Sequence, residues 1–242
     1  MGRTVKPQVN FKGLPIAARM TIILFGMFGL AAILYAISLQ PTFASGRMVL
    51  LLAIAIVSAR AKVNVYKGST ISFLTCVVLL AVIREGPAIA VLLAVCGVTV
   101  QTLLPSRKVV LHQLAFNGGM IALTVVATWW TYGFIVRTQA IDTLTAELAA
   151  TILASFTYFL GNSISVSLIV SLSKKMSMLH IWSHHFVYSA PSFVIAGLLS
   201  LGVNGLTSTH FAIITAAIIG VISLAYYCSL KFVNERIHAS SN

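Results

Sequence analysis

The segment ELAATILASFTYFLGNSISVSLIVSLS, residues 147–173, decides the fold class of this chain. It is long enough to cross a bilayer, for which roughly 20 apolar residues suffice. Polar side chains recur along it three or four residues apart, so they share one face of a helix: Thr151, Ser155, Tyr158, Asn162 and Ser165. Because a polar stripe facing lipid costs free energy, we expect this face to contact other helices or a water-filled cavity. The segment is therefore predicted to lie in the middle of a helical membrane bundle.

The composition of the whole chain supports this class. Of its 242 residues, 59% are hydrophobic and only 8% are charged, whereas about a quarter of the residues in soluble domains are charged. We therefore predict an all-α integral membrane protein with a single polytopic membrane domain over residues 1–242. The three cysteines all lie within hydrophobic runs and form no CxxC pair, so we expect neither a disulfide framework nor a metal site from them.

Hydrophobic runs separated by basic or turn-forming segments predict a bundle of about eight transmembrane helices within residues 20–230. One or two of them are expected to be short or re-entrant, the second run above all. The basic segment 1–19 and the tail 231–242 flank the bundle. The predicted runs are 20–39, 48–58, 69–83, 88–104, 109–136, 147–173, 186–203 and 210–230.

The formal net charge is +12. With an even number of spans, most Lys and Arg residues fall on the side that holds both termini, which is the pattern of the positive-inside rule. We therefore expect both termini in the cytoplasm and the protein in the bacterial inner (cytoplasmic) membrane. Membrane lipids, and not nucleic acid, are the expected electrostatic partners of the basic residues.

The segment between the second and third runs has two interpretations. Residues 62–66, KVNVY, alternate polar and apolar side chains, and Lys67-Gly68 supplies a turn, which indicates a short hairpin-like insert. A solvated basic loop is the alternative, and it is the interpretation that we favour from the sequence.

Two asparagines mark the candidate site. In the fifth run Gln113, Asn117, Thr124, Thr128 and Thr131 share a helical face. Counting from the helix ends places Asn117 and Asn162 at similar depth. They are interpreted either as groups that join helices by hydrogen bonds or as the walls of a pocket for a small neutral or amphiphilic ligand. The candidate pocket residues are Asn117, Thr124, Ser155, Tyr158, Asn162 and Ser165.

Other chemistry finds little support in the sequence. His180 and His184 are an i, i+4 pair and weak candidates for a metal site, but no acid or cysteine stands nearby, so interfacial histidines are favoured. No catalytic motif or pair of carboxylates occurs, and no cofactor is expected. No run carries a deep charged residue, which disfavours ion-coupled transporters but leaves passage of a neutral solute open.

Several short motifs, taken in order along residues 45–236, carry a family resemblance. They are the basic segment 60–67 with Ser69-Thr70-Ile71-Ser72, Gly86-Pro87, His112, Phe116-Asn117, Tyr158-Phe159-Leu160-Gly161-Asn162, Trp182, Phe186, Pro191 and Lys231-Phe232-Val233-Asn234-Glu235-Arg236. This layout resembles the N-terminal multi-helix membrane module of bacterial signalling proteins with HD-type phosphohydrolase or GGDEF output domains. The resemblance implies a module that senses a signal at the membrane and passes it through its last helix.

The chain stops where the output domain of such proteins would begin, so we expect a cytoplasmic or membrane protein partner to receive the signal. The sequence thus favours a non-catalytic sensor or regulatory membrane module. The alternatives are a transporter, or the substrate-binding subunit of one, for a small neutral solute, and a structural assembly factor whose polar stripes only join helices.

Overall fold

The computed structural model describes residues 11–40, 46–60, 62–66, 69–103, 110–137 and 143–205. Within them, four helical segments are long and apolar enough to cross a membrane. They are α1 (Ile16–Leu39), preceded by the short helix η1 (Phe11–Gly13), α5 (Leu111–Arg137), α6 (Thr143–Lys174), and a broken segment made of α7 (Met178–His185), η2 (Val187–Ser189) and α8 (Ala190–Asn204). The helical class is thereby confirmed, and the four long apolar segments support a membrane protein. The expected run 210–230 and the tail 231–242 lie outside the described residues, so the number of spans and the side of the termini stay predictions.

Three shorter helices complete the described part: α2 (Gly46–Arg60), α3 (Phe73–Arg84) and α4 (Pro87–Leu103). The middle of the bundle belongs to α3 rather than to α6 as expected. α3 is buried along most of its length because α2, α4, α5 and α8 all pack against it. Its 12 residues span only about 18 Å, less than the roughly 30 Å of a hydrocarbon core. α6 instead exposes large apolar side chains, Ile152 and Phe156 among them, on its outer face.

A two-stranded hairpin stands between α2 and α3. Strand β1 (Lys62–Tyr66) pairs antiparallel with β2 (Ser69–Ser72), with Val63 opposite Ile71. The favoured interpretation of this segment as a solvated loop was wrong, and the hairpin alternative is confirmed. The third helix consequently begins at Phe73 and not at residue 69. The β-branched residues of both strands explain the choice, since they favour extended backbone over helix.

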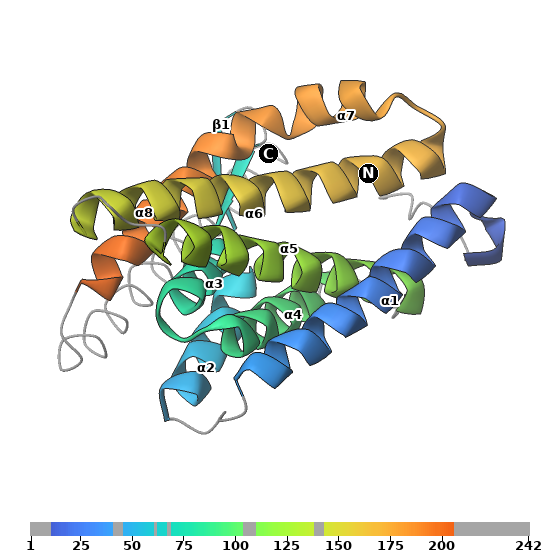
Figure 1. Cartoon of the computed structure of the whole chain (residues 1–242). Coiled ribbons are helices and arrows are strands. Elements are labelled where there is room, and N and C mark those ends of the chain that lie inside the picture. Colours follow the sequence, from blue (N-terminus) through green and yellow to red (C-terminus); the bar gives the residue numbers. More distant parts are fainter. Residues whose placement is uncertain are drawn as a thin grey trace, which may run out of the picture.

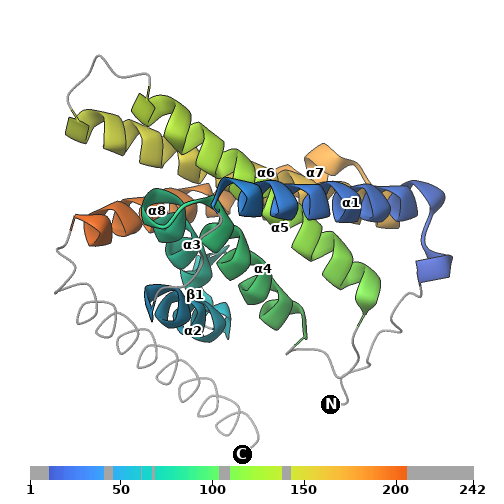
Figure 2. The ribbon, with the colours of Figure 1, turned by 60° about the horizontal axis from the view of Figure 1, so that its bottom comes forward.

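Helices α1 and α5 cross with their backbones in contact (Figures 1 and 2). A Cβ atom added at Gly119 would collide with the carbonyl group of Phe25, and one added at Gly29 would collide with the backbone of Gly119. Small residues at a membrane helix crossing permit such an approach and the dispersion contacts that come with it. The neighbouring Gly118 faces open space. Gly119 therefore fixes where α1 lies on α5.

Helices α5 and α6 pack antiparallel through a second set of small and hydroxyl side chains. A Cβ atom at Gly161 would lie 2.7 Å from Thr124 Oγ1 and 2.8 Å from its Cγ2. Further along, the hydroxyls of Thr131 and Thr157 are 3.2 Å apart. These two contacts set the register of the pair.

The broken segment α7–η2–α8 packs against α6. The Trp182 indole of α7 donates its Nε1–H to Ser163 Oγ at 2.9 Å, and its ring lies tilted beside that of Phe159, with centroids 6.3 Å apart. In α8, Ser200 Oγ donates to the carbonyl oxygen of Cys76 in α3 at 2.8 Å. The broken segment is thereby tied to α6 through α7 and to the central helix α3 through α8.

We expect Trp182→Phe to lower the free energy of unfolding by about 1 kcal/mol, because the variant keeps an aromatic ring but loses one hydrogen bond. The fraction of monodisperse protein left after heating in detergent, measured by size-exclusion chromatography, gives the comparison. Trp130→Phe is the matched control, since Trp130 is 51% exposed. Equal losses in the two variants would contradict the prediction.

Candidate functional site

Figure 1 shows the end of the bundle where α1 and α5 begin and α6 ends. A cavity of about 360 Å³ opens there between side chains of these elements. Its volume is at the small end of the range for ligand pockets, about 300 to 1,000 Å³. We call it the α1–α5–α6 cavity. Its apolar wall consists of Leu14 and Ile22 from α1 and the segment before it, Phe116 from α5, and Val166, Ile169 and Val170 from α6.

Four of the five polar residues that line this cavity lie towards its outer end. His112 and Gln113 come from the first turn of α5, and Ser173 and Lys174 from the last turn of α6. We call these four residues the polar mouth. The cavity thus runs from a polar mouth to an apolar interior, which is the polarity profile of an amphiphile.

Asn117 also lines the cavity, deeper than the polar mouth. Its Nδ2 donates to Thr102 Oγ1 of α4 at 3.0 Å, and that hydroxyl donates to the carbonyl oxygen of Val98 at 2.8 Å. This chain of hydrogen bonds orients the amide and joins α5 to α4. One N–H of the Asn117 amide is therefore used to join α5 to α4, while the side chain still borders the cavity.

The structure does not bring the predicted pocket residues together. Ser155 packs against Gly197 of α8, and the Tyr158 ring lies 5.9 Å from that of Phe193. The polar stripe of α6 consequently faces α8 in this region and not α5. Ser155 Oγ donates to the carbonyl oxygen of Thr151 in its own helix, at 2.7 Å. These groups contribute to helix packing in the structure.

The expected match in depth between Asn117 and Asn162 was wrong. Asn162 is next to Gly161, which contacts Thr124 of α5. Thr124 lies two turns, or about 10 Å, beyond Asn117 along α5, so Asn162 is that much deeper than Asn117. The error lies in the helix ends, because α5 begins later and α6 ends later than the hydrophobic runs indicate. By its spacing, Asn162 shares a helical face with Val166, one turn further from the polar mouth.

The remaining predicted residues lie apart from the cavity. Thr124 and Ser165 are buried on α5 and α6, and neither lines it. His180 and His184 of α7 are exposed, with ring centroids 4.4 Å apart. Across the described residues, no group of three His, Cys, Asp or Glu side chains gathers in a way that could hold a metal ion.

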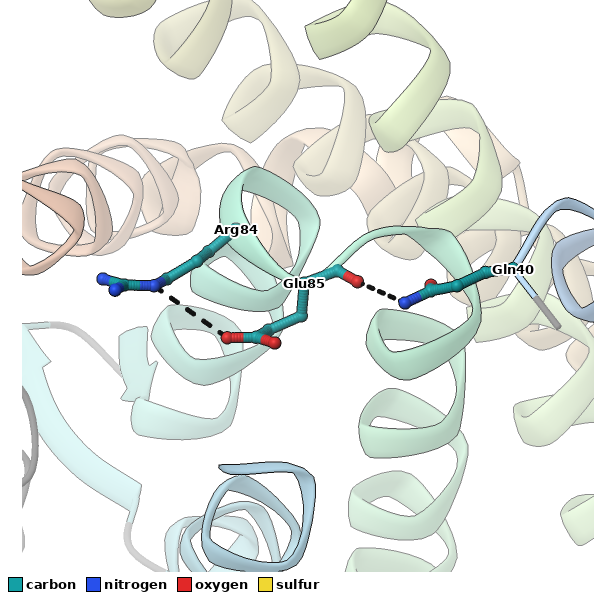
Figure 3. Close-up of polar contacts among 3 residues, drawn as sticks. All are labelled: Gln40, Arg84 and Glu85. Atoms are coloured by element: carbon teal, nitrogen blue, oxygen red, sulfur yellow. Dashed lines mark hydrogen bonds and ion pairs between the residues drawn. The ribbon is translucent and has the colours of Figure 1, made fainter. Parts of the chain in front are cut away.

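A second polar cluster was not predicted from the sequence. At the turn between α3 and α4, the Gln40 side chain donates from Nε2 to the carbonyl oxygen of Glu85 at 2.7 Å (Figure 3). Arg84 Nε lies 4.0 Å from Glu85 Oε1, and the two side chains are only 17% and 11% exposed. Gly86 has φ +95°, and its missing Cβ leaves room for Gln40. The sequence marks this turn through Gly86-Pro87, but only the fold places the end of α1 over it.

No family model, no curated protein and no solved structure was found to match the chain.

Proposed function

We propose that this chain is a non-catalytic sensor or regulatory module of the bacterial inner membrane that binds a small amphiphilic ligand in the α1–α5–α6 cavity. The observation that carries the proposal is the cavity itself, which lies between α5 and α6, borders Asn117 and is lined on a third side by Ile22 of α1. From the sequence, a small neutral ligand and an amphiphilic ligand were both possible. The polarity profile of the cavity favours the amphiphile.

The packing supports a regulatory role for this cavity. α1 is held on α5 by direct backbone contact at Gly119, and α6 is held on α5 at Gly161. A ligand that touches all three helices at one end changes their relative stability at that end. It can thereby shift the equilibrium between two arrangements of the helices, which a cytoplasmic or membrane partner protein would then detect.

The test asks whether a small molecule occupies the cavity in purified protein. We expect wild-type protein, extracted from membranes and washed, to release one class of amphiphile that is detected by mass spectrometry after denaturation. Val170→Trp, which fills the cavity, should retain at least tenfold less of it, about 1.4 kcal/mol in binding free energy.

Ile164→Trp is the matched control, because it adds the same bulk to α6 where the native side chain is 39% exposed. It should retain the amphiphile as wild type does. Equal retention by Val170→Trp and wild type, with both variants folded, would rule out the cavity as the binding site.

A transporter for a small solute is the second candidate, and a separate observation favours it. The described bundle contains the short central helix α3 and a helix broken at η2, between α7 and α8, and discontinuous helices are frequent at the substrate sites of transporters. Flux of radiolabelled neutral solutes into proteoliposomes, compared with empty liposomes, tests it. Flux that Val170→Trp abolishes and Ile164→Trp retains would favour a transporter over a sensor.

A further inference from the structure

The charges around the α1–α5–α6 cavity are of one sign. Lys174 lines it, and Lys175 follows at the end of the same helix. In α1, Arg19 lies one turn before Ile22, and its Nε is buried without a hydrogen bond to any described residue. His112 adds an imidazole to the polar mouth. An anion entering here meets several cationic or hydrogen-bond-donating groups.

The acidic residues of the described part lie at the opposite end of the bundle. Glu147 stands near the start of α6, whereas Lys174 ends that helix. Glu85 lies beside Gln40, at the far end of α1 from Leu14. Among the described residues no carboxylate lines the cavity, so none competes with a bound anion for Lys174.

The apolar wall limits the rest of the ligand. Phe116 and Ile22 are buried together in a small apolar cluster, against which Val166 and Ile169 pack. A volume of about 360 Å³ is filled by one hydrocarbon chain segment beside these side chains. The occupant that matches both parts has a single chain and an anionic head.

We infer that the α1–α5–α6 cavity binds an anionic single-chain amphiphile, with its carboxylate or phosphate at Lys174 and His112 and its acyl chain along Phe116, Val166 and Ile169. This inference rests on the proposed function and specifies its ligand. The same chemistry has two sources, a free fatty acid and an anionic lysophospholipid. Both carry one acyl chain and a negative head.

The experiment uses the full-length protein in nanodiscs of phosphatidylcholine and a palmitate that carries a diazirine in its chain. We expect photolabelling to map, by peptide mass spectrometry, to residues 111–117 and 166–174. Unlabelled palmitate or palmitoyl lysophosphatidylglycerol should compete, and hexadecanol, which has the same chain length and no charge, should compete at least fivefold less well. If only one of the two anionic compounds competes, that compound identifies the source of the ligand, and the result still supports an anionic single-chain amphiphile.

Two matched variants test the role of charge. Lys174→Gln should weaken palmitate binding about three- to fivefold, the effect of a partly exposed ion pair, and leave hexadecanol binding unchanged. Lys175→Gln removes the same charge from the next residue, which does not line the cavity, and should change palmitate binding less than twofold.

Three results separate the two proposals. In the first result, palmitate labels only lipid-facing residues outside the cavity, while wild-type protein still releases an amphiphile that Val170→Trp lacks. This result would overturn the anionic class of the ligand but not the proposed function. Equal competition by hexadecanol and palmitate would do the same. Labelling outside the cavity together with equal amphiphile retention by Val170→Trp and wild type would overturn the proposed function as well.

Discussion

Gly119→Leu is expected to cause a large loss of stability at the crossing of α1 and α5. The added side chain must occupy space that the carbonyl group of Phe25 and the Cα atom of Gly26 already fill. A backbone cannot move aside as the end of a side chain can, so α1 has to separate from α5. We expect a loss of about 3 kcal/mol in the free energy of unfolding, the upper part of the range for overpacked sites.

The neighbouring residue provides the control for this prediction. Gly118 lies on the same turn of α5 and faces open space, so Gly118→Leu adds the same side chain without a collision. We expect it to stay within about 0.5 kcal/mol of wild type, as surface substitutions usually do. The fraction of monodisperse protein after heating, measured for both variants in one detergent, gives the result. Similar losses in the two variants would show that α1 does not contact α5 at Gly119.

The same crossing links stability to the candidate site. α1 supplies Ile22 to the cavity, the segment just before α1 supplies Leu14, and the contact at Gly119 holds α1 at that position. Gly119→Leu should therefore also abolish labelling by the diazirine palmitate at residues 166–174, even in the fraction of protein that stays monodisperse. Gly118→Leu should leave that labelling intact.

The class of the protein was predictable because it depends on composition. A low share of charged residues and long apolar runs are properties of each segment alone, and the four long helical segments match runs that the sequence predicts. The hairpin was harder, since residues 62–72 combine strand-forming side chains with the polarity of a loop. In the structure β2 also packs against η2 and α8, which are more than a hundred residues away, and nothing in the sequence indicates these contacts.

The candidate site was predictable only at Asn117. A polar side chain in an apolar helix indicates a cavity or a partner, and Asn117 has both. The α6 wall of the site depends on the register between α5 and α6. An error of one or two residues in the predicted helix ends changes that register by several ångströms. No feature of Leu14 or Ile22 in the sequence marks them as lining residues, because they reach the cavity only through the crossing of α1 over α5.

Gly161→Ala is the second prediction with a large effect, and it tests the register that separates Asn162 from Asn117. Its Cβ would meet both branches of Thr124, at 2.7 Å and 2.8 Å. Rotation of a β-branched side chain does not remove such a clash, since one branch replaces the other. Relative to Gly118→Ala, which gains the same helix propensity in open space, we expect Gly161→Ala to lose about 2 kcal/mol.

A double-mutant cycle assigns this loss to the contact itself. Thr124→Ala removes both branches that the new methyl group meets, so the pair Gly161→Ala and Thr124→Ala should recover about 1 to 2 kcal/mol over the sum of the single effects. Thr128→Ala, one turn further along α5 and equally buried, should combine additively with Gly161→Ala. If Thr128→Ala gave the rescue in place of Thr124→Ala, α6 would be displaced by one turn along α5. Asn162 would then lie one turn further from Asn117 than the structure places it, and Val166 and Ile169 would move away from the cavity.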